Sequence, residues 1–331
     1  VSSLLGSKVA SNKNLAITID VIAILTTVFG VTTSLGLGTV QISAGLNHVF
    51  EINENFINQL IIIAFITAIG LVSVSLGLDS GIKKLSQINM VLAISLLLFI
   101  FILGPTIFII NALIQNFGAY LNTLIQSATW TEVYNDTSWQ NGWTLFYYAW
   151  WFAWAPFVSL FIARISYGRS IKEFIIGVLF VPSAIVFIWM GVFGNAAIYQ
   201  VINETSQISE MVSSNLPVAL FTLFDVYPIA QFLSILSLIL IVTFFVTSSD
   251  SGALVASMLS SKSQSNINDD SPMLSRITWA ILLGVLAAVL LYAGGLTALQ
   301  TSVVITGVPF ALIVVFACKQ FLKSLKEEII N

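Results

Sequence analysis

Charged side chains are scarce in this chain, and so are the residues of metal and redox chemistry. Only 8% of its 331 residues are Asp, Glu, Lys or Arg, and 57% are hydrophobic, whereas a soluble domain carries roughly 25% charged residues. A single cysteine (Cys318) and a single histidine (His48) exclude a disulfide framework and argue against a zinc, haem or His-based catalytic site. The net charge is −3, so nucleic acid is not an expected partner. We predict an all-α polytopic membrane protein that is not an enzyme.

Eight apolar segments are long enough to cross about 30 Å of hydrocarbon, which takes roughly 20 helical residues. The predicted spans are 15–46, 56–78, 89–113, 143–166, 172–200, 227–251, 274–297 and 299–320. The first is overlong, so it is expected to tilt or to break near Gly36. A short interfacial helix is predicted at 79–88. Residues 114–142 contain apolar residues at helical spacing and are predicted to form an outer helix lying on the membrane.

The positive charges test this topology. If residue 1 is cytoplasmic, all 12 Lys and Arg residues fall in the N-terminal segment, the loops on the same side and the tail. The opposite loops carry acidic residues and no basic residue. Cytoplasmic loops of membrane proteins carry an excess of Lys and Arg. The sequence therefore predicts a multi-pass protein of the cell membrane with both ends of this chain in the cytoplasm.

Half of the eight tryptophans lie in the stretch GWTLFYYAWWFAWAPF at 142–157. Trp143 follows a polar run and fits a girdle at the membrane interface. Trp151 and Trp154 lie about 12 and 16 Å further along a helix, which is too deep for that girdle. Aromatic faces attract quaternary ammonium groups. From the residues alone, these deeper tryptophans are either packing residues or the wall of a cation site.

Two similar hydroxyl runs, FGVTTS at 29–34 and FFVTSS at 244–249, lie inside apolar spans. Thr247 and Ser248 offer hydroxyl oxygens, and Phe244 offers a carbonyl if the helix loosens there. Uncharged oxygen ligands suit a weakly held Na⁺. Hydroxyls in membrane helices also bond to carbonyls of their own helix or tie helices together, so an ion site and a packing role remain open. Asp250 is predicted to be an N-cap or ion-pair residue at the cytoplasmic end rather than an ion ligand.

The sequence resembles the betaine/carnitine/choline transporter family over nearly all of its length. The stretches that carry the resemblance are DVIAILTTVFGVTTSLGLGTVQISAGL (20–46), SGIKKLSQINMVLAISLLLFIFILGPT (80–106), GWTLFYYAWWFAWAPFVSLFIARISYGRSIKEF (142–174) and VTSSDSGALVASMLSS (246–261). The tryptophan-rich motif is the most specific of them.

This resemblance implies a sodium-solute-symporter-like, LeuT-type fold of two inverted five-helix repeats. The chain would be the C-terminal two-thirds of a transporter, with the last three spans of the first repeat in 1–113. The amphipathic connecting helix would be 114–142, and the second repeat with a short cytoplasmic tail would be 143–331. A start at Val1 rather than Met fits a missing N-terminal part, which would hold a Gly-rich unwound helix and the other aromatic half of the substrate cage.

The family resemblance also assigns site residues. Trp151 would be the principal face for the trimethylammonium group, and Trp150 and Trp154 would line the cage and its cytoplasmic path. Tyr148 stands where many members have Trp. The implied sodium ligands are Phe244, Thr247 and Ser248 at one site, and Thr27 and Phe157 at a second. Val31 occupies a place where sodium-coupled members can have Thr, which puts the second site in doubt.

The implied function is import of a quaternary ammonium compatible solute, namely glycine betaine, choline or carnitine. Na⁺ is the expected coupling ion, no other cofactor is expected, and a homotrimer is one arrangement that the family allows. The interior of the spans, away from their ends, contains no Lys or Arg, which favours ion coupling over sodium-independent exchange, and that exchange stays an alternative. The other alternative is a truncated, non-transporting remnant or sensor, and the upstream coding sequence would distinguish it.

Overall fold

The computed structural model describes residues 1–76, 83–134, 138–204, 206–261 and 271–330, and this part of the chain is helical without strands. Its helices are α1 (Ser7–Ser11), α2 (Lys13–Phe50), α3 (Phe56–Leu76), α4 (Lys83–Leu103), α5 (Thr106–Ala128), α6 (Phe146–Ile165), α7 (Ile171–Ile175), α8 (Val181–Ile202), α9 (Ile208–Ser214), α10 (Ala219–Phe224), α11 (Ala230–Ser260) and α12 (Met273–Ile330). π-helical turns at Gln140–Leu145 and Ile176–Phe180 lead into α6 and α8. Short 3-10 turns lie at Ser2–Leu5 and Leu216–Val218.

Eight described helical segments are long and apolar enough to cross a membrane, but they are not the eight predicted spans. The predicted span 89–113 is wrong at its end, because α4 stops at Leu103 and a separate helix, α5, starts at Thr106. Proline cannot donate the backbone bond that would continue the helix, so Gly104 and Pro105 separate the two helices. Of the predicted interfacial helix 79–88, residues 79–82 lie outside the described part and the rest form the first turns of α4.

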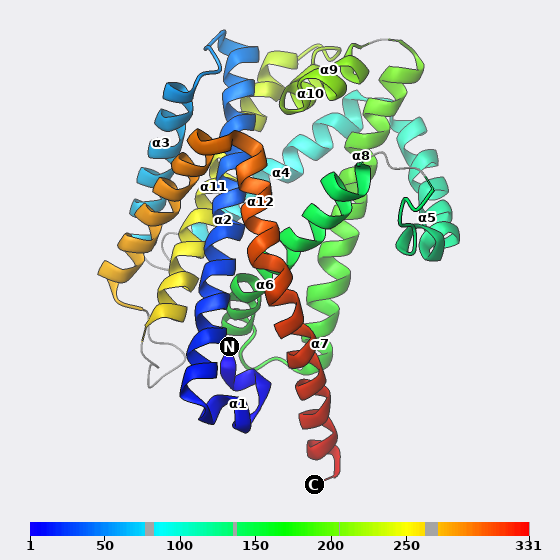
Figure 1. Ribbon diagram of the computed structural model, residues 1–331. Coiled ribbons are helices and arrows are strands. Elements are labelled where there is room, and N and C mark those ends of the chain that lie inside the picture. The colour runs from blue at the N-terminus through cyan, green and yellow to red at the C-terminus, as the bar shows by residue number, and fades with distance from the viewer. Residues whose placement is uncertain (77–82, 135–137, 205, 262–270, 331) are drawn as a thin grey trace.

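The last two predicted spans are the two arms of α12. The chain departs from helical geometry at Gly294 and at Gly295, where φ is 57°. A positive φ of this kind is readily adopted only by glycine. Figure 1 shows the consequence, since the orange first arm rises to a turn and the red second arm descends from it. The chain therefore bends three residues earlier than the gap predicted between 297 and 299.

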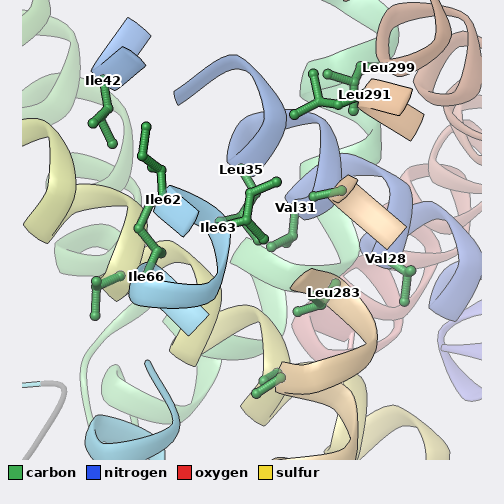
Figure 2. Close-up of a cluster of buried hydrophobic side chains, with 14 of the residues drawn as sticks. Val28, Val31, Leu35, Ile42, Ile62, Ile63, Ile66, Leu283, Leu291 and Leu299 are labelled. Carbon is green, nitrogen blue, oxygen red and sulfur yellow. The ribbon is translucent and has the colours of Figure 1, made fainter. Parts of the chain in front are cut away.

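Helix α2 is the centre of the bundle and packs against α3, α6, α11 and α12. It runs without interruption from Lys13 to Phe50, so the predicted break near Gly36 is absent. Gly36 instead allows a close approach, because a side-chain carbon there would collide with Leu299 of the second arm of α12. Figure 2 shows buried side chains of α2, α3 and α12 meeting around Leu35, which is fully buried. Transmembrane helices associate in lipid largely through close packing of this kind.

A second apolar cluster joins α4, α5, α8, α10 and α11, around the fully buried Ile100, Ile109 and Phe224. Helix α5 packs mainly against α8 and leaves most of its surface exposed. Both ends of the chain lie in the lower half of the view in Figure 1, while α9 and α10 lie at the opposite end of the bundle. The core thus fixes α2, α6, α11 and α12 relative to one another, and these helices carry the candidate site residues.

Candidate functional site

Helix α6 is wedged between α2 and α12 by small residues on its inward face. Ala149 and Ala153 are almost completely buried. A side-chain carbon at Gly30 of α2 would lie 3.1 Å from the Ala153 side chain and carbonyl oxygen, and one at Gly307 of α12 would collide with the Ala149 carbonyl. Small residues let membrane helices approach at backbone distance. Phe157, one helical turn further, is also buried, at 6% exposed.

The opposite face of α6 is aromatic and open. Trp151 is 68% exposed and Tyr148 is 64% exposed. A hollow of about 440 Å³ is lined by Tyr147, Trp150, Trp151, Trp154, Ala155 and Val158. A neighbouring hollow of about 520 Å³ is lined by Tyr147, Tyr148, Trp151, Phe152, Ala155 and Val314. The three tryptophans assigned to the cage therefore share one hollow, whereas Tyr148 lines the other hollow with the second arm of α12.

Trp150 belongs to both faces of α6. Its ring lines the tryptophan hollow, but its indole N–H points to α2, where it donates to the Ser34 hydroxyl at 3.2 Å and to the Gly30 carbonyl oxygen at 3.4 Å. The ring stacks on Phe146 with centroids 5.5 Å apart and meets the edge of Tyr147. Its orientation is thus fixed by contacts on several sides.

Trp154 connects the hollow to Phe157, one of the two residues assigned to the second sodium site. Its ring meets Phe157 edge to face with centroids 5.3 Å apart. Two buried polar atoms, the Trp154 indole nitrogen and the Thr27 hydroxyl oxygen, have no hydrogen-bond partner among the described residues. An indole N–H can only donate, whereas a hydroxyl oxygen can also accept a proton or face a cation, so only Thr27 offers an ion a ligand here. Val31 offers no oxygen, and its methyl groups pack where a side chain at Gly252 would begin.

The hydroxyl run of α11 is engaged within its own helix. Thr247 and Ser248 each donate to the Phe244 carbonyl at 2.9 Å, and the side-chain amide of Asn89 on α4 donates to the Thr247 hydroxyl at 3.2 Å. Helix α11 continues from Ala230 to Ser260 without loosening at Phe244. That carbonyl is therefore not free in this arrangement, although both hydroxyl oxygens keep capacity to accept a further contact.

Asp250 lies ten residues before the end of α11 and is fully buried, so its predicted role as a helix cap is wrong. Its carboxylate accepts hydrogen bonds from Ser73 of α3 and from the adjacent Ser251. The acid therefore joins α3 to α11 next to the hydroxyl run. This partner could not be predicted from the sequence, because Ser73 is one of many serines in the predicted spans.

The whole chain can be compared with known proteins. A family model described as BCCT, betaine/carnitine/choline family transporter, matches residues 1–330. The chain is 41% identical to a glycine betaine transporter of Acinetobacter baylyi over 93% of this chain and 46% of that protein. It is 40% identical to the glycine betaine transporter OpuD of Bacillus subtilis over 99% and 63%, and 38% identical to a high-affinity choline transport protein of Escherichia coli over 94% and 46%. The chain thus spans about half the length of these relatives.

Proposed function

The chain belongs to the betaine/carnitine/choline transporter family, and on that basis we propose that it forms the C-terminal part of a secondary transporter for a quaternary ammonium solute. The expected solutes are glycine betaine, choline and carnitine, imported with Na⁺ as the coupling ion. We propose a LeuT-type arrangement of two inverted repeats, with the ends of this chain in the cytoplasm. Both ends lie in the same half of the bundle in Figure 1, which agrees with their being on one side of the membrane. The homotrimer stays a prediction of the family resemblance.

The observation that carries this proposal is the shared hollow of Trp150, Trp151 and Trp154. A trimethylammonium group cannot donate a conventional N–H hydrogen bond, so a protein recognises it by aromatic faces that offer a negative quadrupole. Each such contact contributes about 0.5–2 kcal/mol, with the larger values for desolvated contacts. Trp151 offers the most accessible of the three rings, and Tyr148 extends the aromatic surface on its other side.

The proposed sodium ligands come from three helices. The Thr27 hydroxyl is buried and unpartnered among the described residues, so its oxygen suits a weakly held Na⁺, and the ring of Phe157 would be the second ligand. Thr247 and Ser248 would contribute hydroxyl oxygens at the other site, next to the Phe244 carbonyl. Sodium can drive transport by alternating access only if it binds the solute-binding arrangement more tightly than the other one.

The test is uptake of radiolabelled glycine betaine, choline and carnitine by the full-length natural protein, with and without Na⁺. The proposal predicts saturable uptake of at least one of the three solutes. That uptake should be lost when the Na⁺ of the buffer is replaced by K⁺. Absence of uptake of all three would contradict the substrate class and favour a non-transporting remnant or sensor.

Sodium-independent exchange is the second candidate function, and Val31 is the observation that favours it, because it puts methyl groups where an additional hydroxyl ligand is expected. Vesicles preloaded with unlabelled solute distinguish the two. Exchange predicts that preloading accelerates uptake equally with and without Na⁺, whereas sodium symport predicts a requirement for the ion.

A further inference from the structure

Ser34 lies in the contact between α2 and α6 and is 3% exposed. Its hydroxyl donates to the Gly30 carbonyl one turn earlier at 3.1 Å and accepts the indole N–H of Trp150 at 3.2 Å. A hydroxyl has one proton to donate and lone pairs to accept. The bond to Gly30 therefore turns the Ser34 lone pairs toward the incoming indole N–H.

This arrangement determines where the Trp150 ring lies. The indole is held at its nitrogen by Ser34, with the Gly30 carbonyl as a longer second acceptor, and on one face by the stacked Phe146. The contact between Gly30 and Ala153 keeps the two helices at backbone distance, so the ring has little room to adjust. Since Trp150 also lines the hollow with Trp151 and Trp154, its orientation sets the inner wall of that hollow.

The similar run on α11 gives a contrast. Ser249 aligns with Ser34 in the two hydroxyl runs and is also buried, but its hydroxyl has no hydrogen-bond partner in the described part of the chain. The similar sequence of the two runs therefore does not by itself produce the contact, since of the two serines only Ser34 accepts a hydrogen bond from a tryptophan.

We propose that Ser34 is a positioning residue for the solute-binding hollow. It acts through Trp150 and does not touch the solute, and it links the aromatic wall on α6 to α2, the helix that carries Thr27. This inference rests on the proposed function, because it names a determinant of the affinity of the same hollow.

The decisive variants are Ser34→Ala, which removes the nearer of the two acceptors of the Trp150 indole N–H and leaves the Gly30 carbonyl, and Ser34→Thr, which keeps both. Thr39→Val is a matched control, because the buried Thr39 hydroxyl also bonds to its own helix, at the Leu35 carbonyl, without an indole contact. All are made in the full-length natural protein. Solute uptake kinetics, equilibrium solute binding and the amount of folded protein in the membrane are measured for each.

Ser34→Ala is expected to raise the KM and the Kd for the solute roughly three- to tenfold, which is the scale of one hydrogen bond. Maximal uptake and folded protein should change less than about twofold, Ser34→Thr should stay within twofold of the wild type, and Thr39→Val should leave KM unchanged. A double variant of Ser34→Ala with Trp150→Phe should have no higher KM than the worse single variant, because both remove the same bond.

An unchanged KM in Ser34→Ala, an equal rise in Thr39→Val, or additive effects in the double variant would each overturn the positioning role. A wild-type protein that neither binds nor transports any quaternary ammonium solute would overturn the proposed function instead. In that case the hydrogen bond between Ser34 and Trp150 is tested by the thermal unfolding midpoints of the two single variants and the double variant. Non-additive loss of stability then supports the contact, and additive loss contradicts it.

Discussion

The two faces of α6 differ in what they require from the rest of the molecule. The inward face consists of small residues such as Ala149 and Ala153, which are buried against glycines of α2 and α12. The outward face carries Tyr148 and Trp151, each more than 60% exposed. One face fixes the position of the helix and the other presents aromatic surface. A rigid support with an accessible surface is what a binding site needs, because ordering the site in advance lowers the cost of binding.

The largest expected effect comes from breaking the inward face. Gly307→Ala should abolish accumulation of folded protein, because the added carbon collides with the Ala149 backbone and a backbone cannot move aside as a side chain can. Gly142→Ala is the control, since nothing lies near a side chain at that position. Membrane content and the thermal unfolding midpoint are the measurements. Equal folded yields for the two variants would show that α6 is not held at backbone distance.

Removing the Thr27 hydroxyl of α2 should weaken sodium binding and leave the fold intact. Thr27→Val keeps the volume of the buried side chain and deletes the hydroxyl that lacks a partner among the described residues. The Na⁺ concentration for half-maximal uptake should rise about tenfold, equivalent to roughly 1.4 kcal/mol. Thr18→Val, at an exposed threonine of the same helix that bonds to the Asn14 carbonyl, should leave it unchanged. The same sodium dependence in both variants would remove Thr27 from the site.

The smallest effect is expected from Trp154, whose ring lines the hollow but whose indole nitrogen makes no hydrogen bond among the described residues. Trp154→Phe keeps an aromatic face in the hollow and removes an N–H group that has no partner among the described residues. The KM for the solute should change less than about threefold, since little hydrogen-bond energy is lost. A rise above tenfold in KM would show that the solute itself accepts this N–H group.

The sequence predicted the class of fold because composition and segment length are sufficient to identify membrane helices. It placed Pro105 inside a span instead of at a helix end, since whether a proline kinks or ends a helix depends on what packs beside it. The predicted position of the turn in α12 was three residues too late, because the gap between two apolar runs does not reveal which residue adopts a positive φ. Nothing local to Gly36 predicted a helix contact with Leu299 instead of a break.

The same limit applies to the candidate site. The tryptophan motif predicted that Trp150, Trp151 and Trp154 act together, and they line one hollow. It did not predict that the Trp150 nitrogen turns to Ser34, because the partner lies 116 residues away in the chain. Asp250 was assigned to a helix end for the same reason, since its partner Ser73 comes from another helix. Local sequence indicates the chemistry available, and long-range packing decides which groups meet.

The most direct test of the central claim is equilibrium binding and uptake of labelled solute by the full-length protein carrying Trp151→Leu, beside Trp143→Leu as the control. Trp143 is about half exposed and lines neither aromatic hollow. The account predicts that Trp151→Leu abolishes uptake while leaving folded protein in the membrane, and that Trp143→Leu keeps near-normal uptake. Unchanged solute affinity and uptake in Trp151→Leu would contradict the assignment of the hollow to the quaternary ammonium group.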